Sequence, residues 1–230
     1  MGMAQAPPAR RIDKIVASLA GAVADIGDGA TVLVGGFGDV GVPFGLAHAL
    51  LDQGARDLTI VSNNAGSGET GVAALLKAGR VAKIVCSFPK TAGSTVFEEL
   101  YRAGRIELEL VPQGTLAERM RAAGAGIGAF FTPTGAGTLL AQGKETRLLE
   151  GREQVLEYPL RGDFALIRAA KADRWGNLVY RKTARNFSPV MATAARTTIV
   201  ETAEIVELGA LDPEAIVTPG AFVRRVVLNP

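Results

Sequence analysis

The sequence has very little cysteine or histidine: Cys86 and His48 are the only ones among 230 residues. A single cysteine cannot form an internal disulfide, which fits a reducing compartment. Cys86 falls in an apolar run and is expected in the core rather than as a nucleophile. His48 lies inside a predicted helix, and no Ser–His–acid triad can be assembled around it. We expect no bound metal and no cysteine chemistry.

The chain also lacks an excess of charge of either sign and any long apolar run. Its 25 basic and 23 acidic residues leave a formal net charge of +2, so nucleic acid is not an expected partner. No apolar run is long enough to span a bilayer, and residues 1–11 lack the apolar region of a signal peptide. We predict a cytoplasmic protein without a membrane contact, in which residues 1–11 form a flexible tail.

Apolar residues and glycine are abundant instead. Apolar residues make up 48% of the chain, which is typical of a packed globule rather than a disordered segment. The 28 glycines belong to no low-complexity repeat, so they indicate many tight turns between strands and helices. Because no linker, repeat or charge block divides the sequence, we predict one domain over residues 1–230.

Short apolar runs alternate with helical patterns through the first half of the chain. The predicted order is a helix over 12–26 capped by Asp13, strand 31–34, a helix opened by Pro43, strand 58–61, helix 72–77, strand 81–86, helix 94–103, strand 106–111 and helix 115–123. Thr115 and Glu118 have the spacing of a capping box, which predicts the start of the last helix. Such an alternation is typical of a parallel sheet with helices on both faces.

The second half of the sequence follows another pattern. It predicts a hairpin formed by 146–149 and 154–158, strands 164–170 and 178–180 joined through 175–177, a helix over 191–195, and strands 198–200 and 222–228. The predicted fold class is therefore α/β: an open, mostly parallel sheet with helices on both faces plus antiparallel C-terminal strands.

Ligands of an open parallel sheet bind beyond the carboxyl ends of its strands. Here those ends lead into loops 35–43, 62–70, 87–94 and 112–114, which are rich in Gly, Asn, Gln, Ser and Thr. Backbone N–H groups and neutral amides suit a carboxylate, a carbonyl oxygen or a phosphate. The candidate side chains are Asn63, Asn64 and Gln113, although an Asx turn is an equal alternative for the paired asparagines.

The first of these loops contains G-x-G-x-x-G between a predicted strand and a predicted helix, at residues 36–41. A dinucleotide site would also need an acid at the end of the second strand, where Asn63 and Asn64 stand, and a helix already running at Pro43. Because of the glycine motif, a nicotinamide-dependent oxidoreductase is kept as the alternative from a different class. A non-catalytic ligand-sensing domain is the third hypothesis. Packing in a tight turn would explain some of the glycines.

Several stretches resemble the A subunit of the 3-oxoacid CoA-transferases, family I. The matching stretches are 28–38 with 41–43, 61–66, 112–119, 131–135, 162–166 and 181–187. Together they cover nearly the whole chain after its N-terminal tail. Stretches 55–60, 85–89 and 173–178 look like the 3-oxoadipate branch of the family. The acetoacetate-handling branch shares the main motifs and stays open as an alternative.

The resemblance implies transfer of CoA from succinyl-CoA to a 3-oxoacid, 3-oxoadipate first, through a glutamyl-CoA thioester. In the family the attacking glutamate belongs to a Ser-Glu-Asn-Gly motif on a B subunit. This chain has Ser-Asn-Asn-Ala-Gly at 62–66, and an asparagine amide cannot replace a carboxylate nucleophile. The implied enzyme is an A2B2 heterotetramer, inactive without its B subunit, with an acyl-CoA and a 3-oxoacid as substrates and no further cofactor.

Positioning and charge stabilisation remain for this chain. We expect Gln113, Asn63 and Asn64 to reach across the subunit interface to the acyl and carboxylate oxygens. The resemblance assigns CoA binding to the glycine-rich turn of the first loop, which consists of Gly35, Gly36, Phe37, Gly38, Asp39, Val40 and Gly41. A second carboxylate on the substrate would need a cation, for which Arg174 and Arg185 are candidates.

Overall fold

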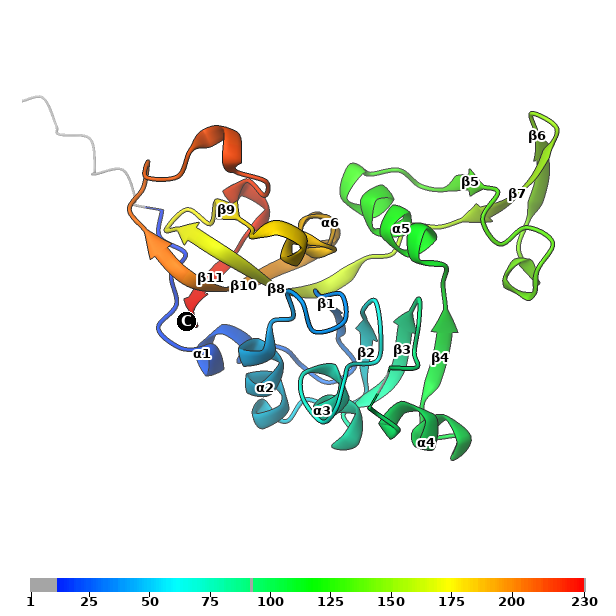
Figure 1. Ribbon diagram of the computed structural model, residues 1–230, viewed down its shortest axis with the longest axis horizontal. Coiled ribbons are helices and arrows are strands. Elements are labelled where there is room, and N and C mark those ends of the chain that lie inside the picture. The colour runs from blue at the N-terminus through cyan, green and yellow to red at the C-terminus, as the bar shows by residue number, and fades with distance from the viewer. Residues whose placement is uncertain (1–11, 92, 230) are drawn as a thin grey trace, which may run out of the picture.

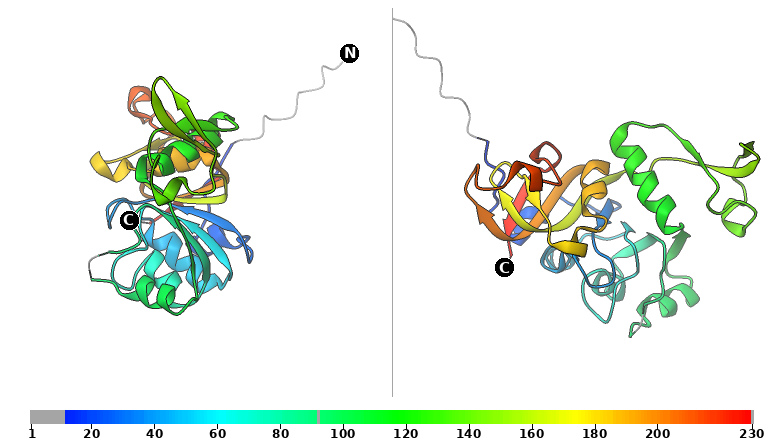
Figure 2. Two further views of the ribbon diagram at one scale, coloured as in Figure 1. Left: turned by 90° about the vertical axis from the view of Figure 1, so that its right-hand side faces the viewer. Right: turned by 45° about the horizontal axis from the view of Figure 1, so that its top comes forward.

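Figure 1 shows a computed structural model of the chain, which describes residues 12–91 and 93–229. A large sheet occupies the centre of the molecule, and a smaller sheet projects from it at the right of Figure 1 and of the right-hand view in Figure 2. The tail expected at 1–11 lies outside the described residues, and the single domain over 1–230 stays a prediction.

The large sheet has the strand order β11-β10-β8-β1-β2-β3-β4, with β9 paired to β8. Its strands are β1 (Thr31–Val34), β2 (Leu58–Val61), β3 (Val81–Cys86), β4 (Glu107–Leu110), β8 (Gly162–Asp173), β9 (Leu178–Val179), β10 (Ala195–Val206) and β11 (Arg225–Leu228). Every neighbouring pair on this path is parallel. The chain therefore moves outward from β1 to β4 on one side and returns through β8 on the other.

Helices cover both faces of this sheet, as Figure 1 shows. One face carries α1 (Leu19–Val23), α2 (Phe44–Gln53), α3 (Val72–Lys77) and α4 (Val96–Arg102), and the other carries α5 (Gln113–Ala125) and α6 (Ser188–Ala194). Alternation along β1 divides the core accordingly, because Val32 and Val34 join one buried cluster and Leu33 joins the other. The predicted α/β class with helices on both faces is confirmed.

Antiparallel pairing occurs at β8–β9 and in the smaller sheet. That sheet consists of β5 (Phe130–Thr132), β6 (Thr146–Leu149) and β7 (Arg152–Glu157) in the order β5-β7-β6. Glu150 and Gly151 both have positive φ, the geometry of a two-residue hairpin turn, so the predicted hairpin is confirmed. The C-terminal strands β10 and β11 run parallel to β8, since helical segments carry the chain back each time.

Four predicted helix starts are wrong. The helices expected over 94–103 and 191–195 begin at Val96 and Ser188. The helix expected over 12–26 is reduced to α1, whose cap is Ser18, because Ile15 forms a β-bridge with Val226 instead. Helix α5 begins at Gln113 rather than at the expected capping box, and Thr115 is buried inside it. The bounds expected for β1, β2, α3 and β3 match the structure.

Single-turn 3-10 helices complete the described elements: η1 (Leu139–Ala141), η2 (Lys182–Arg185), η3 (Pro213–Ala215) and η4 (Gly220–Phe222). None of the described helices combines the length and the apolar character needed to cross a membrane.

Candidate active site

A cavity of about 470 Å³ lies at the carboxyl ends of β1, β2, β3 and β4. We call it the strand-end cavity. All four loops expected to hold a ligand contribute to it, and it brings together the three predicted amide side chains. Its lining residues are Phe37, Gly38, Asn63, Asn64, Ser87, Phe88, Lys90, Thr91 and Gln113.

Asn63 connects three of the loops. Its Oδ1 accepts one hydrogen bond from Nε2 of Gln113 and another from Oγ of Ser87, both at 2.8 Å. A carbonyl oxygen has two lone pairs, so these two donors use the acceptor capacity of this side chain. The Nδ2 group of Asn63 is therefore the end that remains to donate to a bound oxygen.

Asn64 forms the Asx turn that is the alternative role for the pair. Its Oδ1 accepts a hydrogen bond from the backbone N–H of Gly66 at 2.8 Å. Among the described residues its Nδ2 donates to no protein group, and Asn64 also lines the strand-end cavity. The structural role thus orients the donor end of Asn64 and leaves that end available.

Gln113 is the first residue of α5, and it is exposed. The first intrahelical bond runs from the N–H of Leu116 to the carbonyl of Pro112, at 2.8 Å. The N–H groups of the preceding helical residues have no intrahelical partner, and the positive end of the helix dipole coincides with them. The early start of α5 therefore adds backbone donors beside the Gln113 amide.

Residues 35–41 of the first loop are called the glycine turn below. Phe37 and Val40 exchange backbone hydrogen bonds of 3.0 and 3.1 Å, so the segment closes on itself as a tight turn. A dinucleotide-binding glycine loop instead leads directly into a helix, whereas α2 begins only at Phe44. At Gly38, φ is 57°, and a Cβ added there would meet no atom within 4 Å. This open space lets a ligand approach the backbone.

The other glycine-turn residues occupy three environments. Phe37 and Gly38 line the strand-end cavity, Gly35, Gly36 and Asp39 line a small hollow beside it, and Val40 and Gly41 contact the segment that precedes α6. Asn186, in that segment, accepts from the N–H of Gly36 at 3.1 Å and donates to the carbonyl of Val40 at 2.9 Å. Sequence reasoning assigns Asn186 no role, although it belongs to the matching stretch 181–187.

Three further polar side chains stand apart from the cavity. Glu69 is an exposed loop acid that pairs with Lys77. His48 is exposed on α2. Cys86 is fully buried in β3, and this burial raises the pKa of its thiol to about 12. The expectations that His48 lies in a helix and that Cys86 is a core residue are confirmed.

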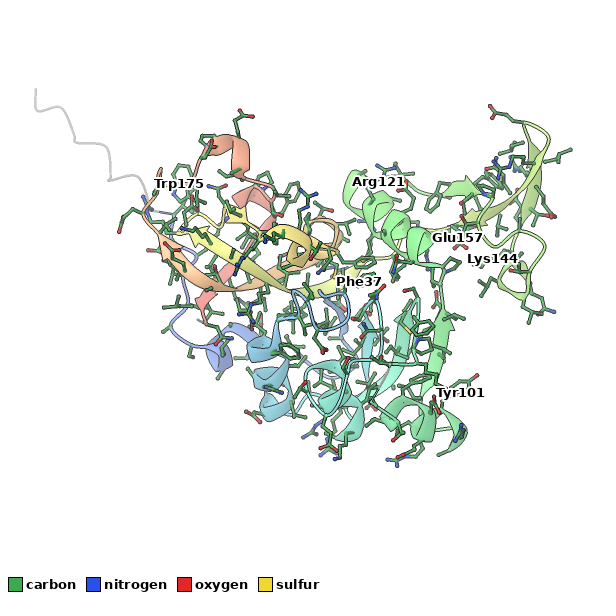
Figure 3. All side chains as sticks on the ribbon, in the orientation of Figure 1. Phe37, Tyr101, Arg121, Lys144, Glu157 and Trp175 are labelled. Atoms are coloured by element: carbon green, nitrogen blue, oxygen red, sulfur yellow. The ribbon has the colours of Figure 1, made fainter. Side chains whose placement is uncertain are left out.

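The two arginines considered for a second carboxylate lie elsewhere. Arg174 donates to the carbonyl of Ile12 at 2.6 Å and lies over the ring of Trp175. In Figure 3, Trp175 is at the left of the molecule and Phe37 at its centre. Arg185 belongs to η2 and does not line the strand-end cavity.

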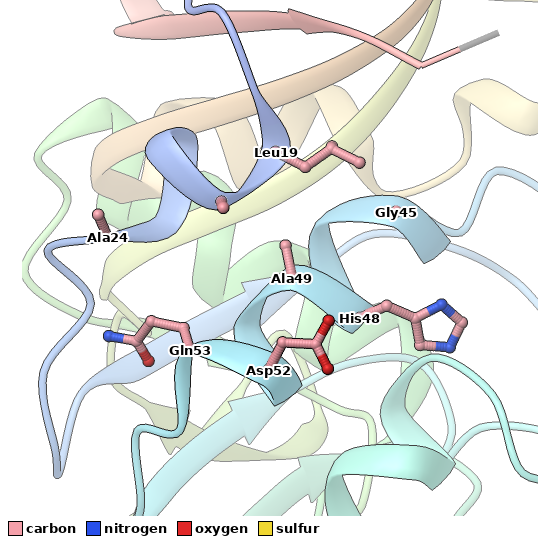
Figure 4. Close-up of a pocket in the computed structure, with 8 residues that line it drawn as sticks. Leu19, Ala24, Gly45, His48, Ala49, Asp52 and Gln53 are labelled. Carbon is pink, nitrogen blue, oxygen red and sulfur yellow. The ribbon is translucent and has the colours of Figure 1, made fainter.

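A larger hollow of about 780 Å³ lies between α1 and α2 (Figure 4). Most of its side chains are small or apolar, and it opens along helix surfaces rather than at the strand ends. Its lining residues are Leu19, Ala20, Ala24, Gly45, His48, Ala49, Asp52 and Gln53. Over 12–91 and 93–229 there is no group of three or more His, Cys, Asp or Glu residues able to hold a metal ion. The convergent amide donors favour the strand-end cavity as the site.

The family model for coenzyme A transferases matches residues 16–229. The chain belongs to the coenzyme A transferase family. This assignment confirms the enzyme class expected from the sequence, a CoA-transferase. The chain is 65% identical over 216 residues to the A subunit of 3-oxoadipate CoA-transferase from Pseudomonas putida, with 94% of each chain covered. It is 51% identical over 227 residues to the A subunit of succinyl-CoA:3-ketoacid coenzyme A transferase from Xanthomonas campestris, covering 99% of this chain and 92% of that one.

A solved coenzyme A transferase structure has the same fold. The acyl-CoA transferase YdiF apoenzyme from Escherichia coli O157:H7 superimposes with a TM-score of 0.85 at 25% identity. The match covers 97% of this chain and 48% of YdiF, so the present chain spans about half the length of that protein.

Proposed function

We propose that this chain is the A subunit of a CoA-transferase that moves CoA from succinyl-CoA to 3-oxoadipate. The attacking carboxylate is a glutamate of a B subunit, and the assembly is A2B2. The observation that carries this proposal is the composition of the strand-end cavity, where amide and backbone donors converge without a carboxylate among the described lining residues. Coenzyme A enters as part of a substrate, and we propose no other cofactor.

The chemistry follows from a carboxylate acting on a thioester. The glutamate oxygen attacks the succinyl carbonyl carbon, the C–S bond breaks, and CoA leaves as a thiolate while a glutamyl–succinyl anhydride forms. The thiolate then attacks the glutamyl carbonyl, which releases succinate and forms a glutamyl-CoA thioester. A carboxylate of 3-oxoadipate attacks this thioester, and the same steps in reverse give 3-oxoadipyl-CoA and restore the glutamate.

Each attack places negative charge on a carbonyl oxygen, and this charge requires hydrogen-bond donors. Nδ2 of Asn63 and of Asn64, together with the side chain of Gln113, supply such donors from the strand-end cavity. The backbone N–H of Gly38 lies at the open tip of the glycine turn, where the thioester end of CoA would pass. These residues position and stabilise, whereas the bond-making oxygen comes from the partner chain.

The choice of 3-oxoadipate rests on the name and 65% identity of the Pseudomonas relative, against 51% for the Xanthomonas relative named for 3-ketoacids. Acetoacetate is thus the second candidate acceptor. The nicotinamide-dependent alternative loses its support because the glycine turn is closed by Phe37 and Val40. A fluorescence titration of the lone chain with NADH gives an independent check, and we expect no saturable binding.

Co-expression with a candidate B subunit tests the proposal. We expect 3-oxoadipate-dependent loss of succinyl-CoA by the assembled enzyme, none by the isolated chain, and a CoA adduct on a glutamate of the B subunit in mass spectra. Sedimentation of the purified complex tests the A2B2 stoichiometry. Turnover by the isolated chain, or a CoA adduct on Glu69 of this chain, would overturn the division of labour between the subunits.

A further inference from the structure

We infer that Lys90 binds the second, non-reacting carboxylate of a dicarboxylic substrate and so selects dicarboxylic over monocarboxylic acids. This inference rests on the proposed function and names the residue that sets its substrate class. It starts from the charges of the strand-end cavity. Among the described residues that line this cavity, Lys90 alone carries a formal charge.

The remaining surface of the cavity divides into two kinds. The amides of Asn63, Asn64 and Gln113 form a donor-rich part that suits the reacting carboxyl group. Phe37 and Phe88 form an apolar part, and they stay exposed by 51% and 63% in this chain. A second carboxylate bound against these rings would lose water without a partner, which is costly, unless the ammonium group of Lys90 meets it.

The loop that carries Lys90 is anchored on both sides of this residue. Phe88 forms a β-bridge with Asn64, and Thr91 forms one with Ser94. The backbone of Lys90 therefore has a defined place at the rim of the cavity, while its side chain is 74% exposed. The backbone of Lys90 is thus held in place, while its exposed side chain is free to turn its ammonium group toward a ligand.

The present partner of Lys90 can be exchanged at little cost. Its Nζ lies 3.1 Å from Oε1 of Glu98, in an ion pair whose lysine side chain is 74% exposed and whose glutamate side chain is 26% exposed. Ion pairs at the protein surface contribute only about 0–1 kcal/mol, and the exposed Lys90 end is free to leave. Glu98 also pairs with Arg102 at 3.3 Å, so it retains a cation when Lys90 turns to a substrate. Succinyl-CoA and 3-oxoadipate both carry the required second carboxylate, whereas acetoacetate does not.

The test compares Lys90→Met with wild type in the enzyme assembled with its B subunit. The two acceptors are 3-oxoadipate and 3-oxohexanoate, which has the same chain length but a methyl group in place of the remote carboxylate. In a double-displacement reaction, kcat/KM for the acceptor is independent of the donor half-reaction, so succinyl-CoA serves for both. Lys77→Met is the matched control, because Lys77 is likewise an exposed lysine paired with a glutamate but does not line the cavity.

We expect Lys90→Met to lower kcat/KM for 3-oxoadipate about tenfold to a hundredfold, the range for losing one charged hydrogen bond. The value for 3-oxohexanoate should stay within about twofold, and Lys90→Arg should recover most of the 3-oxoadipate activity. An equal loss with both acids, or no loss with either, would overturn the role of Lys90. Absence of CoA transfer by the wild-type complex with either acid would instead overturn the proposed function.

Discussion

The side-chain oxygen of Asn186 accepts a hydrogen bond from the backbone N–H of Gly36 at 3.1 Å, across 150 residues of sequence. The amide of the same side chain donates to the carbonyl of Val40 at 2.9 Å. Two points of the glycine turn are thus held by one residue from the second half of the chain. Asn186 has a φ of 22°, a value rare outside glycine, and these bonds stabilise it there.

Asn186→Ala should therefore loosen the glycine turn. We expect KM for succinyl-CoA to rise about threefold to tenfold, equivalent to roughly 1 kcal/mol for a lost hydrogen bond, with a smaller effect on kcat. Steady-state kinetics of the assembled enzyme measure both. Asn186→Asp keeps the acceptor for Gly36 but not the donor for Val40, and should fall between alanine and wild type. A lower melting temperature with unchanged KM would restrict Asn186 to a structural role.

Gln113→Ala removes an amide donor from the strand-end cavity while leaving its exposed position at the start of α5 intact. We expect kcat to fall about 10²- to 10³-fold, as for loss of one oxyanion donor, with little change in melting temperature. Gln142→Ala is a suitable control, since Gln142 is exposed at the end of η1 and does not line the cavity. A wild-type rate for Gln113→Ala would remove this residue from the mechanism.

Glu201 predicts a particular dependence of stability on pH. Its carboxylate is fully buried under the start of α2, where Oε2 accepts from the N–H of Leu46 at 2.9 Å. Burial raises the pKa of Glu201 above its ordinary value of 4.5, despite this hydrogen bond and the nearby Arg168. The folded protein thus holds this proton more tightly than the unfolded chain does. The resulting stability is present below pH 4.5 and is lost as the pH rises through the folded-state pKa.

Urea unfolding across this range checks the effect. We expect the free energy of unfolding of the wild type to fall with rising pH relative to that of Glu201→Gln, which cannot titrate. Taking the difference between the two proteins cancels the other carboxylates. A difference that does not change with pH would show that folding leaves the pKa of Glu201 unchanged, and one of opposite slope would show that folding lowers it; either result contradicts this prediction.

Cys86 offers a probe of the sheet, because it is the only cysteine in the sequence. Its fully buried thiol has a pKa of about 12, so at pH 8 almost no thiolate forms in the folded state. We expect a thiol-specific reagent to label the native protein slowly and the urea-unfolded protein at once. Cys86→Ala gives the blank. Rapid stoichiometric labelling of the native protein would mean that β3 opens readily beside the site.

The elements that the sequence predicts well are those with local causes. Strands β1, β2 and β3 are short apolar runs between glycine-rich or polar loops, and their bounds match. The predicted start of α5 is too late because Thr115 and Glu118 imitate a capping box. In the structure the Thr115 side chain is only 3% exposed and the helix has already begun at Gln113.

Features with distant causes are less accessible. The strand-end loops predict that Asn63, Asn64 and Gln113 gather, since parallel strands share a carboxyl edge. The loop after β3 is predicted to hold a ligand, but its sequence does not tell which residues face inward, so it does not single out Lys90. The bracing by Asn186 depends on a contact across 150 residues, which local patterns do not record.

The position of β1 between β2 and β8 affects the order in which the enzyme matures. Strand β1 pairs on one side with β2 and on the other with β8, whose partner residues begin at Phe164. A nascent polypeptide that has emerged from the ribosome only through β4 therefore leaves the β8 side of β1 as an open edge, prone to pairing with other chains. The glycine turn acquires its hydrogen bonds to Asn186 later still, because Asn186 is translated after β8. Products of this gene that end before Asn186 would consequently lack the residue that holds the turn, even where strands β1 to β4 have formed.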